Sequence, residues 1–237
     1  MELNLPVIAV PETKGFRLVN SKLPPIDIFN DVADPDEFQD LFDLQAMTNP
    51  RLKQEVGDLN YIDLEEIPWG IPGCYYAAAP FTHVFPDGSR FSNGEYGMLY
   101  IGDTMETALA EVEYHQGRYL ANIDDLKFDR MIFRGLACTF TGDVIHDATA
   151  LPATHEIYQP DDYSASRALG AHLRAGNSEG IQYWSVRNSG ATCWGLFTPR
   201  HVHSVVQTAN VEFIVRGGEI VDRKKVLGMS FPEKRRN

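Results

Sequence analysis

A short apolar segment followed at once by an amphipathic helix is the feature that most constrains the fold. The segment GMLYIG, residues 97–102, is apolar and short enough to be a buried strand. Asp103 is expected to cap the helix that follows, with Glu106 three residues on in a capping-box-like arrangement. Apolar residues then recur at helical spacing from about Thr104 to Tyr119, at Met105, Ala108, Leu109, Val112 and Tyr119. This pattern predicts a helix that packs one face on its neighbours.

The three glutamates of this predicted helix are not equivalent. At 100° per residue, Glu111 and His115 lie one turn apart on the same flank of the apolar stripe, and Glu113 lies on the opposite flank. Glu106 falls in the first turn, where its charge suits the helix dipole. Glu111 is therefore the carboxylate predicted at the edge between helix and sheet, where a cleft could open.

The remaining pattern favours an α+β fold. Helix signals alternate irregularly with pairs of strands joined by tight turns, which differs from a regular βαβ repeat. We predict strands at 16–20, 74–85 (interrupted by Pro80), 126–140 and on both sides of the turn Asn188-Ser189-Gly190. We also predict a hairpin around Gly217-Gly218, and helices that start at Asp34-Pro35, start near Asn49-Pro50 and end at Gly57, and span Ser164 to Ala175.

Composition and charge exclude several classes of protein. The chain has 237 residues and a formal net charge of −12, which should repel DNA, RNA and anionic membranes. Its basic tracts, 223–225 and 234–236, are more simply explained as solvated tail. No apolar run approaches the length of a membrane span, and the start of the chain lacks the basic residues of a secretory signal. We therefore expect a cytoplasmic protein that contacts neither nucleic acid nor membrane.

Common catalytic and metal-binding motifs do not occur in the sequence. There is no GxGxxG, GxxxxGK[ST], HExxH or GxSxG motif, and the histidines do not fall at ligand spacing. The three cysteines, Cys74, Cys138 and Cys193, are far apart and form no CxxC pair, so they are expected in the core. We expect no metal site.

Four polar residues remain as candidates. Arg90 follows a turn, Tyr100 lies in the strand before the helix, Glu111 lies on the helix edge, and Ser185 lies within YWSVR. Each has an ordinary explanation, as a solvated arginine, a packed tyrosine, a rim glutamate and the polar side of a strand. Taken singly, such residues are more often structural than functional.

Together, these residues resemble a known family. The segments SRFSNGEYGMLYIGDTMETALAEVEYH and SRALGAHLRAGNSEGIQYWSVRNSGATCWGLF are similar to the RES domain, which is named for an arginine, a glutamate and a serine. Those three residues would be Arg90, Glu111 and Ser185. The resemblance spans roughly residues 16–205. It implies a fold like that of ADP-ribosyltransferases, with a mixed sheet and flanking helices. It also implies a toxin that destroys NAD+ by hydrolysis or phosphorolysis and pairs with a helix-turn-helix antitoxin.

The resemblance also suggests a domain organisation. We predict a single catalytic domain over 16–216, with a lead-in at 1–15 and a hairpin and tail at 217–237. A helical insertion at about 31–67 and the C-terminal tail distinguish the chain from compact toxins of the family, which leaves the antitoxin open. The oligomeric state is also left open, with a homo-oligomer among the alternatives.

Cleavage of NAD+ assigns roles to these residues. Nicotinamide departs as a neutral base, so the reaction needs no general acid, and Glu111 would stabilise the positive ribose. Arg90 would bind the pyrophosphate, with Arg17 as a second candidate because it matches an arginine that the family often places on this strand. Tyr100 would offer its ring to nicotinamide.

Further groups would support the site. Ser185 would donate a hydrogen bond to ribose or phosphate, and His115 and Arg187 would contact substrate from nearby positions, Arg187 on the same strand face as Ser185. NAD+ would be the substrate, and no cofactor is expected. Two other hypotheses remain: transfer of ADP-ribose to a protein, and an inactive NAD-binding or interaction module.

Overall fold

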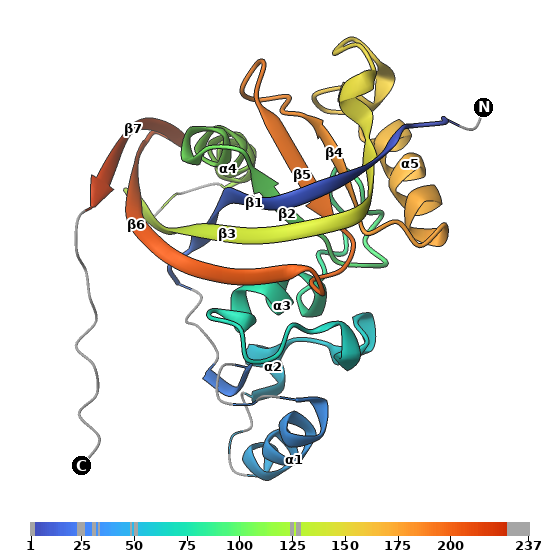
Figure 1. Ribbon diagram of the computed structural model, residues 1–237. Helices are drawn as coiled ribbons and strands as arrows, with labels where there is room; N and C mark the ends of the chain where they lie inside the picture. Colours follow the sequence, from blue (N-terminus) through green and yellow to red (C-terminus); the bar gives the residue numbers. More distant parts are fainter. Residues whose placement is uncertain are drawn as a thin grey trace.

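The computed structural model describes residues 3–22, 27–29, 32, 34–47, 49, 52–123, 126 and 129–226. They form an α+β fold around a seven-stranded mixed sheet, as the sequence predicts (Figure 1). The strands are β1 (Val7–Asn20), β2 (Leu99–Gly102), β3 (Arg130–Asp147), β4 (Gly180–Trp184), β5 (Thr192–Leu196), β6 (Val202–Arg216) and β7 (Glu219–Val226). The helices are α1 (Pro35–Ala46), α2 (Leu52–Val56), α3 (Cys74–Thr82), α4 (Met105–Leu120) and α5 (Ser164–Ala175). Short 3-10 turns lie at Asp27–Phe29, Leu59–Tyr61, Leu64–Glu66, Ala148–Ala150 and Glu156–Tyr158.

Five of the strands close into a ring. The strand order is β1-β2-β5-β4-β3-β6-β7, and β1 also pairs with β3. The β1–β3 pairing is antiparallel and long, from Val7 opposite His146 to Asn20 opposite Phe133. In contrast, β1 meets β2 only at Phe16 opposite Gly102. Because this contact is so short, β1 and β2 diverge beside it, and side chains from both can face a common space.

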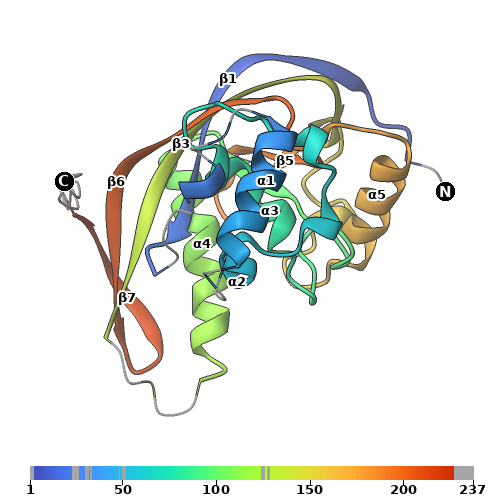
Figure 2. The same cartoon turned by 90° about the horizontal axis from the view of Figure 1, so that it is seen from below.

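Helix α4 packs over the sheet on the side of this divergence (Figures 1 and 2). Four residues of its predicted apolar stripe join a core cluster with Leu18 of β1 and with Phe133 and Phe213 of β3 and β6: Met105, Ala108, Leu109 and Val112. Tyr119, predicted in the same stripe, is instead exposed near the end of the helix. The N-cap is Thr104, whose side chain accepts a hydrogen bond from the Thr107 amide, so the predicted cap at Asp103 is wrong by one residue. Asp103 instead accepts from the Thr107 hydroxyl and from the Thr192 amide, which ties the helix start to β5.

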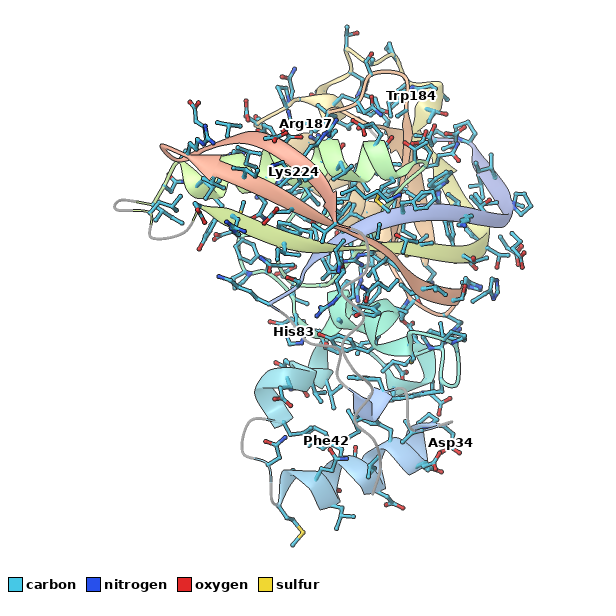
Figure 3. The ribbon with its side chains drawn as sticks, turned by 90° about the vertical axis from the view of Figure 1, so that its left-hand side faces the viewer. Asp34, Phe42, His83, Trp184, Arg187 and Lys224 are labelled. Carbon is cyan, nitrogen blue, oxygen red and sulfur yellow. The ribbon has the colours of Figure 1, made fainter. Side chains whose placement is uncertain are left out.

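Helices α1, α2 and α3 form a lobe on the face of the sheet opposite α4 (Figure 1). Figure 3 shows Asp34 and Phe42 of this lobe at the end of the molecule opposite Trp184 and Arg187. Asp34 caps α1 and Pro35 begins it, as predicted. The lobe has its own core, in which Phe29 stacks on Phe38 with ring centroids 5.0 Å apart. The described residues of 31–67 include α1, α2 and two 3-10 turns, in agreement with the predicted helical character, and their status as an insertion stays a prediction.

The predicted strand over 74–85 is wrong, because residues Cys74–Thr82 form α3. An apolar run of this length does not distinguish a strand from a buried helix. The helix is buried on more than one side, so its sequence lacks an amphipathic pattern, and the alanines from Ala77 to Ala79 favour helix. Pro80, which is predicted to interrupt a strand, instead lies inside the helix near its end.

Other predicted elements agree with the structure. Helix α5 has the predicted bounds, and the hairpins around Asn188–Gly190 and Gly217–Gly218 form as β4–β5 and β6–β7. Strand β1 begins at Val7 within the predicted lead-in, and β3 extends beyond 140 to Asp147. Residues 227–237, which include the second basic tract, lie outside the described residues. Within the described ranges, no helix is both long and apolar enough to span a membrane.

Candidate active site

A cavity of about 230 Å³ lies where β1 and β2 diverge beneath α4. Five of the seven predicted site residues line it: Arg17, Arg90, Tyr100, Glu111 and His115. The other lining residues are Phe16, Leu18, Ser89, Ile101, Gly102, Ala108, Val112, Tyr183 and Cys193. Side chains from β1, from the turn before β2, from β2 and from α4 therefore meet at one place.

Glu111 is held by Ser185. The Ser185 hydroxyl donates to Glu111 Oε1 at 2.7 Å, across 74 positions of sequence. The same hydroxyl oxygen accepts from the backbone amides of Arg187 and Asn188 at 3.2 and 3.0 Å, and Ser185 is buried. Because these two amides use its acceptor positions, the serine hydroxyl is directed to donate to the carboxylate. The structure thus joins the predicted glutamate and serine as a pair.

Arg90 is buried, and no carboxylate pairs with it within the described part of the chain. Its Nη1 donates to the backbone carbonyls of Ile157 and Gln159, both at 3.1 Å. Its guanidinium carbon lies 4.5 Å from the ring centroid of Tyr163. These contacts use Nη1 and one face of the guanidinium, and none of the contacting groups carries a negative charge.

Tyr100 lines the cavity with its ring and fixes the turn that carries Arg90 with its hydroxyl. That hydroxyl accepts from the Phe91 amide at 3.0 Å and bonds the Ser89 hydroxyl at 2.7 Å, the residues on either side of Arg90. Burial raises the pKa of Tyr100 to about 12, so it remains a neutral phenol at neutral pH. Its predicted contact with nicotinamide stays a prediction.

Arg17 brings a second guanidinium to the cavity from β1. Its Nε and Nη1 are buried and have no hydrogen-bond partner among the described residues. Desolvation by burial lowers the pKa of Arg17, against smaller opposing effects of Cys138 and Tyr75. A buried guanidinium of this kind is costly unless an anion joins it.

His115 lies at the rim of the cavity, one turn of α4 beyond Glu111. Desolvation by the surrounding protein lowers its pKa below the usual value, against the opposing effect of Glu111. At neutral pH the imidazole is therefore uncharged, and the charged groups that line the cavity are two guanidiniums and one carboxylate.

Ser185 and Arg187 do not line the cavity themselves, and only Ser185 contacts a lining carboxylate. Strand β4 ends at Trp184, so residues 185–190 form a turn and Arg187 does not share a strand face with Ser185. Its Nη2 donates to the Pro160 carbonyl, and its guanidinium carbon lies 3.2 Å from the ring centroid of Tyr114. Figure 3 shows Arg187 on the same side of the sheet as α4, away from the helical lobe. Its predicted contact with substrate stays a prediction.

Sequence reasoning missed Tyr183 and Cys193, which line the cavity from facing positions of β4 and β5. Tyr183 precedes Ser185 by two residues, so the period of a strand could have found it. Burial raises the pKa of Cys193 to about 12, so this residue is a neutral thiol and not a nucleophile. No group of three or more His, Cys, Asp or Glu side chains is placed to hold a metal within the described part of the chain.

Two known proteins are similar to parts of this chain. An uncharacterized protein named y4oC, from Sinorhizobium fredii (strain NBRC 101917 / NGR234), is 30% identical over 99 residues, which are 40% of this chain and 40% of that protein. The chain therefore spans less than half the length of this curated relative. Among solved structures, the crystal structure of the M. tuberculosis MbcT-MbcA toxin-antitoxin complex aligns over 85% of this chain and 87% of that one. Its TM-score is 0.42 and its sequence identity 10%.

The RES domain family matches residues 67–216. This stretch contains Arg90, Tyr100, Glu111, His115 and Ser185, whereas Arg17 and most of the helical lobe precede it. The match covers more than half of the chain, and the chain belongs to the RES domain family.

Proposed function

We propose that this protein cleaves the bond between nicotinamide and ribose in NAD+, with water or phosphate as the acceptor. The observation that carries the proposal is the composition of the cavity. Two guanidiniums that have no carboxylate partner among the described residues, those of Arg17 and Arg90, line the cavity together with one carboxylate, Glu111, which a serine orients. The family membership and the resemblance described above supply the substrate class.

The charges of the cavity suit a dinucleotide. A pyrophosphate carries two negative charges, and guanidiniums bind phosphate oxygens through paired N–H groups. Arg17 and Arg90 would supply these donors, and binding of an anion would offset the cost of burying Arg17. The cavity is smaller than pockets that enclose whole ligands, about 300–1,000 Å³. We therefore assign the nicotinamide riboside end and the pyrophosphate to it and place the adenosine outside.

The reaction is a substitution at the ribose carbon. The carbon–nitrogen bond breaks and its electron pair stays on nicotinamide, which leaves neutral and needs no proton. Glu111 stabilises the positive charge that develops on the ribose, and the bond from Ser185 keeps its carboxylate in place. The acceptor oxygen then forms a bond to the same carbon: a water molecule loses a proton to solvent in this step, whereas phosphate attacks through an oxygen that is already deprotonated.

The biological setting follows from the family resemblance and is part of the proposal. The protein would act in the cytoplasm as the toxin of a toxin–antitoxin pair, with a helix-turn-helix antitoxin as its partner. It would use NAD+ as substrate without a cofactor, and we propose no contact with nucleic acid. A homo-oligomer stays among the proposals.

The test is nicotinamide release from NAD+ by purified protein, with and without phosphate. Glu111→Gln should reduce the rate by about 100-fold or more, because it removes the charge that stabilises the ribose cation. Glu113→Gln is the matched control: this glutamate lies on the same helix, pairs with Arg223 and does not line the cavity. ADP-ribose as product indicates hydrolysis, and ADP-ribose-1″-phosphate indicates phosphorolysis.

Three outcomes would contradict the proposal. Full release by Glu111→Gln would show that this carboxylate is not used. Incorporation of labelled ADP-ribose into a protein at stoichiometric levels would favour a transferase. Binding of NAD+ without consumption by the wild type would favour an inactive binding module.

A further inference from the structure

Arg90 is held by one segment of the chain, which we name the strap and define as residues 157–163. The strap begins within the 3-10 turn Glu156–Tyr158 and ends where α5 begins. Its Ile157 and Gln159 carbonyls accept from Arg90 Nη1, and the ring of Tyr163 lies 4.5 Å from the guanidinium carbon. The side chain is therefore fixed at its edge by two carbonyls and at its face by an aromatic ring.

The ring of Tyr163 contacts a second arginine, Arg167 of α5. The Arg167 guanidinium carbon lies 5.7 Å from the ring centroid. Arg167 also donates to the carbonyls of Ser89, at 3.0 Å, and Asp87. Tyr163 and Arg167 thus hold both the side chain of Arg90 and the backbone turn that carries it.

The middle of the strap is fastened from the other side by α4 and the turn after β4. Arg187 donates to the Pro160 carbonyl while it stacks on the ring of Tyr114. The Tyr114 hydroxyl donates to the carboxylate of Asp161, which Arg118 also approaches at 3.7 Å. Side chains from α4 and from the turn after β4 are therefore bound to the segment that holds Arg90.

These contacts have one property in common, which is that none of them neutralises Arg90. A carboxylate partner would hold the guanidinium but would also compete with phosphate for its donors. Carbonyl oxygens and an aromatic face attract a cation without carrying a net charge. The strap therefore fixes Arg90 and leaves its full charge for a ligand in the cavity.

We propose that the strap is a positioning element for Arg90, in which Tyr163 sets the plane of the guanidinium and Arg187 fastens the segment. The inference rests on the proposed function in one respect, namely that Arg90 binds the pyrophosphate of the substrate. It also gives Arg187 a role that does not require contact with substrate.

The first experiment measures the binding of ADP, which carries the pyrophosphate and no scissile bond, by titration calorimetry. Tyr163→Leu removes the ring and should weaken ADP binding about tenfold, the effect of losing one desolvated cation–π contact. Tyr163→Phe keeps the ring and should retain the wild-type affinity. Tyr119→Leu is the matched control, since Tyr119 is an exposed tyrosine of α4 at 57% accessibility and does not line the cavity.

The second experiment tests whether Tyr163 acts through Arg90. In the background of Arg90→Gln, Tyr163→Leu should cause little further loss of ADP affinity, because the group that it positions is already absent. In NAD+ cleavage, Tyr163→Leu and Arg187→Gln should raise KM by several-fold and leave kcat within about twofold. A merely destabilised protein would instead lose active fraction and hence kcat.

The outcomes separate this inference from the proposed function. If wild type binds ADP but never consumes NAD+, the proposed reaction is wrong and the strap inference is judged by ADP binding alone. Equal ADP affinity for wild type and Tyr163→Leu, or additive losses in the double variant, would overturn the strap inference. Absence of ADP binding by the wild type would overturn the strap inference, and the proposed function would then be judged by nicotinamide release alone.

Discussion

The carboxylates of α4 differ in the groups that they contact. The three glutamates of α4 are chemically alike, yet Glu106 and Glu113 both pair with Arg223 of β7, while Glu111 bonds Ser185 beside the cavity. The angular spacing on the helix separates them from sequence alone. In contrast, two features depend on which segments surround each residue: the lack of partners for Arg17 Nε and Nη1 among the described residues, and the contacts of Arg187. No local pattern encodes those neighbours.

Tyr100 offers a test at this scale. Tyr100→Phe keeps the ring and removes the hydroxyl that the Phe91 amide and Ser89 share, so one donor in the Arg90 turn loses its partner. We expect the free energy of unfolding to fall by about 1–2 kcal/mol and KM for NAD+ to rise more than kcat falls. Urea unfolding and steady-state kinetics measure the two effects. Tyr119→Phe serves as the control, and an unchanged KM would show that the hydroxyl does not position Arg90.

At the scale of elements, prediction succeeded where a segment has one buried face. Helix α5 was predicted with its bounds, because its apolar residues follow a clear stripe and Gly176 ends it. Helix α3 was predicted as a strand because it is enclosed by the lobe on one side and the sheet on the other. An element buried on all sides carries little periodic signal, so only its tertiary surroundings decide its type.

The contact between α4 and β7 gives a second prediction. Arg223 bonds Glu106 and Glu113 from the edge strand, but all three side chains are substantially exposed. Arg223→Gln should therefore lower the free energy of unfolding by at most about 1 kcal/mol, and by less in high salt. Urea midpoints at low and high ionic strength measure this, with Lys225→Gln as a neighbouring control. A loss of nicotinamide release in Arg223→Gln would mean that β7 contributes to the site.

For the whole molecule, the closure of the ring could not be predicted from sequence. The resemblance indicated a mixed sheet, but the pairing of β1 with β3 joins residues more than a hundred positions apart. Such pairings are specified by the sum of many side-chain contacts and not by a turn signal. The predicted single domain over 16–216 is not tested by these observations and stays a prediction.

The buried thiols predict how the molecule responds to alkali. Burial raises the pKa of Cys74 and Cys193 to about 12 and that of Cys138 to about 11, from ordinary values near 9.0. Above pH 9 the unfolded chain loses these protons while the folded protein keeps them. The stability that they contribute is therefore fully present below pH 9 and is lost as pH rises through 11 to 12.

Between pH 9 and the raised pKa of each thiol, that thiol should lower the free energy of unfolding by up to about 1.4 kcal/mol per pH unit. Urea midpoints measured in steps from neutral pH upward would record the decline. Cys74→Ala should flatten the slope relative to wild type. A free energy of unfolding that stays constant above pH 10 would contradict this account.

The position of β1 has a consequence for the time at which the site comes into being. During translation, Arg17 is synthesised before its partner strand β3, which ends at Asp147. Ser185, which orients Glu111, is synthesised after both. A chain emerging from the ribosome therefore carries the first cation long before the oriented carboxylate can exist. We expect the nascent polypeptide to bind no dinucleotide until translation has passed β5, because the ring of strands beside the cavity cannot close before then.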